Sequence, residues 1–300
     1  MRLEGVLFFP VTPFAEDGTV APDVLAEHIR QRLPFAPGAV FAACGTGEFH
    51  ALSQAEVHTV VRTAVAAVAG RVPVFAGVGG TLGQAVEGAR AAAEAGADAL
   101  LLLPPYLVSG PPAGVAAYAR AVADASPLPV VLYHRATARY SARAVVELAE
   151  HERIIGFKDG TGDIGQAQEI VAAVHAAGRR GFLFFNGLLT AELSQGAYRG
   201  IGIPLYSSAA FAMAPEVATA YYVAYRDGDE PRRLELLDRF YLPLVALREE
   251  TPGFGVSLIK AGLRLAGLPV GGVRPPLTDP TPEQLDRLAR ILDAGRAAVA

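Results

Sequence analysis

The stretch PVVLYHRATARYSARAVVELAEHERIIGFK, residues 129–158, holds one complete repeat of the pattern that decides the fold. Two short apolar runs, 129–134 and 153–158, flank an amphipathic segment at 141–151 that opens on the cap residue Ser141. The runs are continuous in apolar residues, which is typical of parallel strands buried on both faces. The stretch therefore predicts a strand, a helix and a second strand in succession.

The same alternation extends outward in both directions. Six further apolar runs predict strands at 5–11, 38–43, 73–78, 98–103, 181–186 and 200–204. Helices are expected between the strands at 21–33, 54–69, 82–95, 112–125, 163–177 and 188–197, with a capping box at Ser53 and Glu56 and an N-cap at Asp163. Eight strand–helix units favour the α/β class and a closed (β/α)8 TIM barrel, and an open doubly wound sheet remains an alternative.

After the eighth predicted strand the alternation stops. The remaining patterns are helical only, at 209–226, 229–250, 253–266 and 281–297. We expect a barrel core over 1–208, followed over 209–300 by the last barrel helix and a C-terminal helical region.

The composition excludes several classes of protein. The 300 residues have a formal net charge of −4 and 19% charged residues, with no basic face to predict a nucleic-acid partner. No apolar stretch approaches the roughly 20 residues of a membrane span, and the first residues lack the pattern of a secretory signal. Cys44 is the only cysteine, which fits a reducing compartment, so we expect a cytoplasmic location. The six histidines are scattered and show no metal-ligand spacing beyond one weak candidate, so we expect no metal.

Lysine is scarce in this chain, which has 26 Lys plus Arg but only two lysines, Lys158 and Lys260. A guanidinium cannot form an imine, whereas an amine with a lowered pKa can. Lys158 closes the apolar strand IIGFK at the strand end where barrel active sites gather, so burial should make it a nucleophile. The alternative is a pairing with Asp159 at a solvated rim. Lys260 lies in an amphipathic helix, which predicts a helix-surface or interface charge.

Other polar residues fall at the ends of neighbouring predicted strands. Tyr133 could transfer protons beside a Schiff-base amine, or be a core tyrosine. The turn Gly45-Thr46-Gly47 could offer backbone N–H groups to a carboxylate, or be a simple tight turn. Arg135 could pair with a carboxylate, or be a surface arginine.

The last two predicted strands also lead to polar residues. Asn186 ends the seventh run and is a candidate substrate-binding residue. Ser207 and Ser208 could hydrogen-bond a second carboxylate or hydroxyls, or cap the helix expected at 209.

Several of these residues lie in motifs of a known family. VTPF at 11–14, GTGE at 45–48, a tyrosine ending the fifth strand and GFKD at 156–159 resemble the dihydrodipicolinate synthase and N-acetylneuraminate lyase family over nearly the full length. Longer strings are similar to its 5-dehydro-4-deoxyglucarate dehydratase branch. They include GTGEFHALS (45–53), LLPPYL (102–107), GFKDGTGDI (156–164), FFNGLLTAE (184–192) and YSSAAF (206–211).

The resemblance implies a role for each matching residue. Lys158 matches the imine-forming lysine and Tyr133 the proton-handling tyrosine, while Thr46 and Gly47 match the turn that holds the keto acid's carboxylate. Ser207 and Ser208 fall where the dehydratase branch differs from the synthases.

Two positions depart from the motifs of the family. Gly45 replaces a threonine that serves in the synthases' proton relay, which argues against a synthase. After Tyr133 the sequence reads His134-Arg135-Ala136-Thr137, where the dehydratases usually have Asn-Arg-Asp-Asn. Only Arg135 keeps its place.

The resemblance also implies a reaction. A decarboxylating dehydratase of this branch converts 5-dehydro-4-deoxy-D-glucarate to 2,5-dioxopentanoate, CO2 and water through a lysine Schiff base, with no cofactor. The partners expected are a small keto-sugar acid and further copies of the chain, as a homo-oligomer (dimer or tetramer). The alternatives are an aldolase, lyase or synthase of the same family acting on another 2-keto acid, and a catalytically silent barrel that senses a sugar acid.

Overall fold

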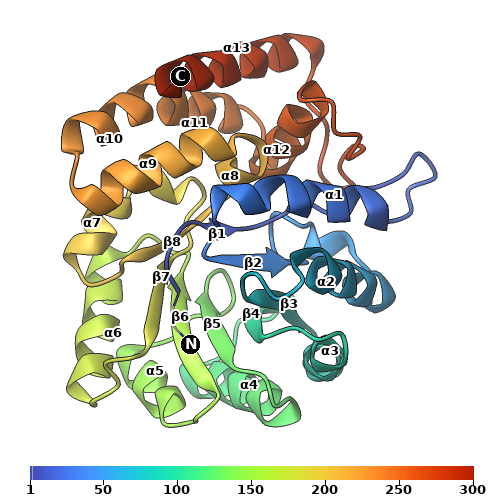
Figure 1. Ribbon diagram of the computed structural model, residues 1–300. Coiled ribbons are helices and arrows are strands. Elements are labelled where there is room, and N and C mark those ends of the chain that lie inside the picture. Colours follow the sequence, from blue (N-terminus) through green and yellow to red (C-terminus); the bar gives the residue numbers. More distant parts are fainter. Residues whose placement is uncertain (2) are drawn as a thin grey trace. The chain divides into compact units, whose positions relative to one another are not determined.

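The computed structural model of this chain describes Met1 and residues 3–300. Eight parallel strands follow one another in sequence order around a closed barrel, which confirms the predicted fold class (Figure 1). The strands are β1 (Leu7–Phe8), β2 (Ala39–Ala42), β3 (Val74–Gly80), β4 (Ala99–Pro105), β5 (Val130–His134), β6 (Ile154–Asp159), β7 (Leu183–Asn186) and β8 (Leu205–Ser208).

Helices separate the strands along the chain, as the alternation predicts. They are α1 (Pro22–Arg32), α2 (Gln54–Val68), α3 (Leu82–Glu94), α4 (Pro112–Ala125), α5 (Ala142–Ala149), α6 (Ile164–Ala176) and α7 (Gln195–Gly200), with short 3₁₀ turns η1 (Leu33–Phe35), η2 (Phe49–Ala51) and η3 (Ala191–Leu193). The expected caps Ser53, Ser141 and Asp163 all accept a hydrogen bond from the first turn of their helices. Each cap satisfies a backbone donor that the helix itself leaves unpaired.

The prediction for the eighth strand was wrong. The apolar run at 200–204 is a turn after α7, in which Gly202 adopts a φ of 88° and the Ile203 N–H bonds to the Tyr198 carbonyl. Ile203 is apolar because it is fully buried, although it lies in no strand. The strand itself is LYSS, and its polar residues mean that it does not stand out as an apolar run.

Two of the helices predicted after β8, those at 209–226 and 229–250, are interrupted in the structure. The helices that follow β8 are α8 (Ala210–Met213), α9 (Pro215–Asp227), α10 (Glu230–Leu236), a π-helical turn η4 (Leu237–Tyr241), α11 (Leu242–Arg248), α12 (Phe254–Leu265) and α13 (Pro282–Val299).

Prolines account for both interruptions. Pro215 forces its predecessor Ala214 out of helical geometry, so the helix expected at 209–226 is split in two. Pro243 cannot donate a hydrogen bond to the carbonyl four residues earlier, and the π-helical turn lies just before it.

The chain forms two compact units, Pro73–Ser207 and Met1–Val72 together with Ser208–Ala300. In the first unit α3 packs beside α4, and α5 beside α6. In the second, α1 packs beside α2, and α13 lies along α9, α11 and α12 (Figure 1). The C-terminal helices thus belong to the same unit as β1 and β2.

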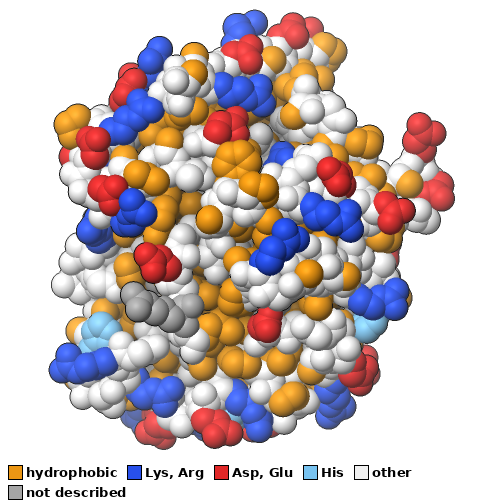
Figure 2. All heavy atoms as spheres, in the orientation of Figure 1, with side chains coloured by type: hydrophobic (Ala, Val, Ile, Leu, Met, Phe, Trp, Pro, Cys, Tyr) orange, Lys and Arg blue, Asp and Glu red, His pale blue; other side chains and the backbone are white. Residues whose placement is uncertain are grey.

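The charged side chains are mixed over the surface. Figure 2 shows Lys and Arg interspersed with Asp and Glu across the face in view. In the part of the chain that the structure describes, no helix is both long enough and apolar enough to cross a membrane.

Candidate active site

Three neighbouring strands of the unit Pro73–Ser207 bring the predicted catalytic residues together. The register pairs Tyr133 of β5 with Lys158 of β6, and Lys158 with Phe185 of β7. Paired residues of parallel strands point to the same face of a sheet. Tyr133 and Lys158 are therefore neighbours on one face.

The Lys158 amine lies over the ring of Tyr133. Its Nζ is 4.2 Å from the ring centroid, and the residue is only 5% exposed. The stem of the lysine runs against the backbone of Gly187, where an added Cβ would come within 2.6 Å of the lysine Cε. Packing on two sides therefore restricts the amine to few positions, as a nucleophile requires.

The Tyr133 hydroxyl is held between two groups. It donates a hydrogen bond to the Gly187 carbonyl at 3.0 Å and accepts one from the Arg135 guanidinium at 2.9 Å. Burial by itself would raise the pKa of this phenol, but the positive charges of Lys158 and Arg135, and hydrogen bonds with both, lower it below its ordinary value. A phenol with a lowered pKa is a better proton donor near neutral pH.

Asp159 has a structural role beside the lysine. Its carboxylate accepts hydrogen bonds from the Thr161 N–H and hydroxyl, from the Gly162 N–H and from the Tyr198 hydroxyl. These contacts fix the turn that follows β6. The residue is 1% exposed, so Lys158 and Asp159 do not lie at a solvated rim as in the alternative interpretation.

The unusual residues His134 and Thr137, which follow Tyr133, form hydrogen bonds that hold the loop after β5. His134 accepts a hydrogen bond from the Tyr140 N–H on Nδ1, so its Nε2 donates to Gln166 in the neutral ring. Burial is the main reason that the pKa of His134 lies below its usual value. Thr137 donates to the Pro105 carbonyl at the end of β4. The loop therefore holds Arg135 in place against Tyr133.

Asn186 holds the segment that follows it, and Ser207 bonds to the Asn186 backbone. The Asn186 amide donates to the Ala191 carbonyl, to Ser194 and to Gln195, and its oxygen accepts from the Leu188 N–H. These bonds make Asn186 a positioning residue for the segment after β7, which includes Gly187. The Ser207 hydroxyl donates to the Asn186 carbonyl.

Ser208 caps a helix, which is one of its two predicted roles. Its hydroxyl accepts a hydrogen bond from the Phe211 N–H at the start of α8. Ser208 is fully buried in the unit that contains β1 and β2.

The turn Gly45-Thr46-Gly47 lies in that same unit. The Glu48 N–H bonds to the Gly45 carbonyl and closes the turn, and the Thr12 hydroxyl donates to the Gly47 carbonyl at 2.7 Å. An added Cβ at Gly47 would lie 3.3 Å from the backbone of Ala43, whereas one at Gly45 would meet open space. Packing thus leaves little room for a side chain at position 47, whereas position 45 has room for one.

Lys260 is not a surface charge, and the prediction for it was wrong. It is fully buried on α12, and its Nζ lies 2.6 Å from the carboxylate of Glu48, which is also fully buried. The same amine donates to the Gly272 carbonyl and lies 3.9 Å from the centroid of the Phe14 ring. Burial lowers the pKa of Lys260 to about 8, and Glu48 opposes the shift. Removing one partner of such a pair typically costs about 3–5 kcal/mol.

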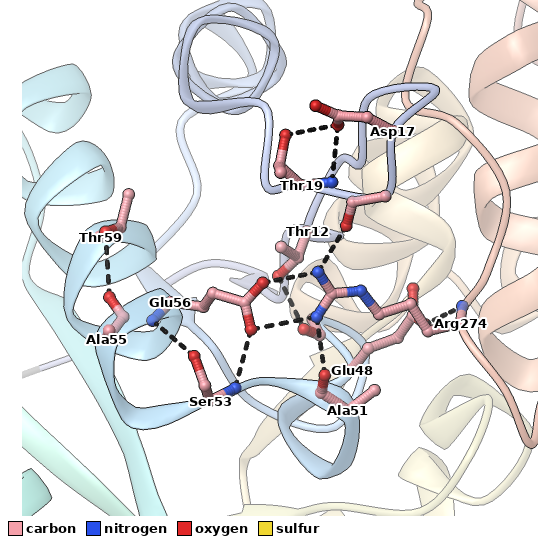
Figure 3. A network of polar contacts seen from close by, with 12 residues as sticks. Thr12, Asp17, Thr19, Glu48, Ala51, Ser53, Ala55, Glu56, Thr59 and Arg274 are labelled. Atoms are coloured by element: carbon pink, nitrogen blue, oxygen red, sulfur yellow. Dashed lines mark hydrogen bonds and ion pairs between the residues drawn. The ribbon is translucent and has the colours of Figure 1, made fainter.

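Arg274 extends this network to the start of α2 (Figure 3). Its backbone N–H donates to the Glu48 carboxylate at 2.8 Å. Its guanidinium forms hydrogen bonds with both oxygens of Glu56 and with the carbonyls of Ala51 and Gly18. One arginine therefore joins the turn, the capping box and the loop after β1.

This arginine makes stability depend on pH. The hydrogen bond from Arg274 is the main reason that the pKa of Glu56 is lowered from 4.5 to about 2. Because the folded-state pKa is lowered, the stabilisation is complete above about 4.5 and is lost as the pH falls through about 2. We expect Glu56→Gln, which keeps the capping box, to cost about 1 kcal/mol at pH 7 and much less near pH 2. Urea unfolding at both values tests this, with the exposed Glu87→Gln as control; a loss that does not change with pH would contradict it.

Sequence reasoning missed two glycines that make room for the candidate catalytic residues Tyr133 and Lys158. An added Cβ at Gly160 would lie 2.7 Å from the Tyr133 ring, and one at Gly187 within 2.7 Å of the Lys158 stem. Both glycines directly follow the residue that ends a strand, FKDG and FFNG, and that position is the only signal available in the sequence.

The Gly187 contact leads to a mutational prediction. Gly187→Ala should displace the Lys158 amine and lower kcat by roughly 100-fold, because misplacements of about 1 Å have effects of that size. Steady-state kinetics with a thermal melt check it. Gly181→Ala is the matched control, since a Cβ there meets open space. Equal activity of the two variants would show that an added Cβ at position 187 does not displace the Lys158 amine, and would contradict the prediction.

The described residues contain no group of three or more His, Cys, Asp or Glu side chains able to hold a metal ion. The chemistry available at β5–β7 is that of an amine and a phenol. Cys44 is buried, and its thiol bonds to the Ala42 carbonyl, as expected for a structural cysteine.

Comparisons with known proteins agree with this geometry. Residues 2–295 match the Dihydrodipicolinate synthetase family. A Streptomyces avermitilis protein named "Probable 5-dehydro-4-deoxyglucarate dehydratase 1" is 50% identical over 98% of this chain and 94% of its own length. The Streptomyces coelicolor protein of the same name is 49% identical, with 98% and 94% covered.

A solved structure supports the fold independently. The crystal structure of dihydrodipicolinate synthase from Oceanobacillus iheyensis superposes with a TM-score of 0.90 at 24% identity, over 99% of this chain and 97% of that one. The full-length family match and the two relatives confirm the resemblance seen in the motifs. This chain belongs to the dihydrodipicolinate synthetase family.

Proposed function

We propose that this chain is a 5-dehydro-4-deoxyglucarate dehydratase, a decarboxylating hydro-lyase that forms 2,5-dioxopentanoate, CO2 and water. The observation that supports it most is the buried Lys158 amine 4.2 Å from the ring centroid of Tyr133, in a chain about half identical to relatives with that name. The pair supplies a nucleophile and a proton donor, and the reaction needs both.

The first half of the reaction removes water. The Lys158 amine condenses with the ketone beside a carboxylate and releases one water molecule as the iminium forms. The iminium acidifies the adjacent CH2, and loss of a proton gives an enamine. The enamine expels the hydroxyl on the next carbon, and Tyr133 protonates the departing oxygen. A conjugated iminium remains on the lysine.

The second half removes CO2. The electrons of the bond to the far carboxylate flow through the new double bond into the same iminium, and CO2 leaves. Proton uptake and tautomerisation give the aldehyde, and the water consumed in hydrolysis of the imine equals that released in its formation. One lysine therefore serves both eliminations, and no step calls for a metal or an organic cofactor.

We also propose the residues that bind the substrate. Thr46 and Gly47 would bind the carboxylate beside the ketone, since the buried Glu48 closes this turn and the backbone of such turns suits anions. Gly45 would leave open space in the turn. Arg135, Ser207 and Ser208 would bind the remaining carboxylate and hydroxyls. Asn186 would act on the substrate through the segment that it positions.

Product analysis tests the proposed function. The purified chain incubated with 5-dehydro-4-deoxy-D-glucarate should release one CO2 and one 2,5-dioxopentanoate for each substrate consumed, measured by gas detection and mass spectrometry. Pyruvate in place of CO2 would identify an aldolase of the same family. A substrate that stays unchanged would refute both activities and favour a binding role.

Assembly and location are further proposals. Large apolar side chains are exposed on the helices after β8, among them Val223, Leu234, Leu242 and Leu265. We propose that they contribute to a homo-oligomer, which a molar-mass measurement in solution tests. A cytoplasmic location is proposed from the single cysteine.

A further inference from the structure

We propose that Lys260, through its buried ion pair with Glu48, is a positioning residue that sets the affinity of the turn Gly45–Gly47 for the substrate carboxylate. The inference rests on the proposed function only in taking that turn as the carboxylate site. All of its geometry lies in the unit formed by Met1–Val72 and Ser208–Ala300.

Glu48 is the residue through which the C-terminal segment acts on the turn. It follows Gly47 directly and has a φ of 56°, a left-handed conformation that residues other than glycine rarely adopt. Its N–H closes the turn onto the Gly45 carbonyl. A change in the backbone of Glu48 would therefore disturb the bond that closes the turn containing Thr46 and Gly47.

Several contacts hold Glu48 in this conformation. One carboxylate oxygen lies 2.6 Å from the Lys260 Nζ, and the other accepts the Arg274 N–H at 2.8 Å. Lys260 is itself fixed by the Gly272 carbonyl and by the face of the Phe14 ring. Phe14 in turn donates its N–H to the Val270 carbonyl. The ion pair thus joins the turn to the segment 270–274.

Stability alone does not explain why Lys260 and Glu48 form a buried ion pair. Burying two opposite charges often stabilises a protein no more than apolar side chains of the same shape would. A buried ion pair can instead serve to hold one conformation of the chain. Here that conformation is the left-handed backbone of Glu48, next to a candidate anion site. The scarcity of lysine points the same way, since Lys260 is one of only two lysines among the 26 Lys and Arg residues.

The test compares single variants with their double. Lys260→Met and Glu48→Gln each leave one buried charge alone, and both should lower the melting temperature. The double variant Glu48→Gln/Lys260→Met leaves no lone charge, so its melting temperature should return toward that of the native chain. If the pair positions the turn, the double variant should still show a KM raised roughly tenfold or more, with kcat changed much less.

Arg264→Met is the matched control. Arg264 also lies on α12 and also donates to the segment after it, to the Gly271 carbonyl and to Asp279, but it does not touch Glu48. Its variant should keep the native KM. A double variant with native KM and native melting temperature would overturn the proposal and leave the pair a structural role only, and so would an Arg264→Met that raises KM as much as the double variant does.

A second readout separates this inference from the proposed function. Borohydride traps a 2-keto acid on an imine-forming lysine, and pyruvate serves as the probe, independently of dehydration or decarboxylation. The half-saturating pyruvate concentration should rise roughly tenfold in the double variant and not in Arg264→Met. Native chain that traps pyruvate but leaves the keto-sugar acid unchanged would refute the proposed function while this comparison still decides the role of Lys260.

Discussion

Replacing Lys158 with methionine should abolish turnover, with a fall in kcat of roughly 10⁴-fold or more, because the nucleophile that forms the imine is lost. Methionine keeps an unbranched stem that fits against Gly187, where the lysine Cγ and Cε lie. The fold should therefore survive, and a thermal melt checks that it does. Lys158→Arg should be equally inactive, since a guanidinium keeps the charge but does not form an imine.

Borohydride trapping with peptide mass mapping checks the same point directly. Only two lysines can form the adduct, Lys158 and Lys260. Native chain treated with the keto-sugar acid should acquire the adduct on the peptide that contains Lys158, and Lys158→Met should acquire none. An adduct on Lys260, or a Lys158→Met variant that still turns over, would rule out the mechanism.

Replacing Tyr133 with phenylalanine should lower kcat by roughly 10²- to 10⁴-fold, the range expected when a positioned proton donor is removed. The ring that lies beside the Lys158 amine remains, so the imine should still form and KM should change little. Single-turnover kinetics should show normal trapping of the imine followed by slow loss of the hydroxyl. The variant also loses the bonds to Gly187 and Arg135, at a cost of about 1 kcal/mol for each.

Tyr118→Phe provides a close match as control. Tyr118 is also a buried tyrosine, and its hydroxyl also donates to a glycine carbonyl, that of Gly80. Its loss removes one hydrogen bond, at a cost of about 1 kcal/mol, and should leave kcat unchanged. If both variants lose the same activity, the effect of Tyr133 is one of packing and not of proton transfer.

Periodicity predicted most of the fold, and its failures have local causes. The runs at 129–134 and 153–158 are strands within one residue of the predicted ends, because buried parallel strands are apolar on both faces. β8 was missed because Tyr206, Ser207 and Ser208 give it polar character. Pro215 indicates a helix break, but the apolar periodicity continues across it, so one helix was predicted where there are two.

The candidate site was predictable where residue type and strand end were enough. Tyr133 and Lys158 end neighbouring predicted strands, and the structure pairs them in register. The need for glycine at position 187 was not predictable, because it arises from contact with Lys158 on the adjacent strand. Lys260 was misjudged for a similar reason, since amphipathic periodicity gives no sign of a carboxylate as distant in sequence as Glu48.

The burial of both lysines also determines how the folded chain reacts with reagents for primary amines. Lys260 is fully buried, whereas Lys158 is 5% exposed and must be reached by the substrate in the folded chain. Acylation of Lys260 by an activated ester should therefore report unfolding, because that amine becomes reactive only when the chain opens. The arginine-rich exterior keeps its positive charges under such treatment, since guanidinium groups do not react.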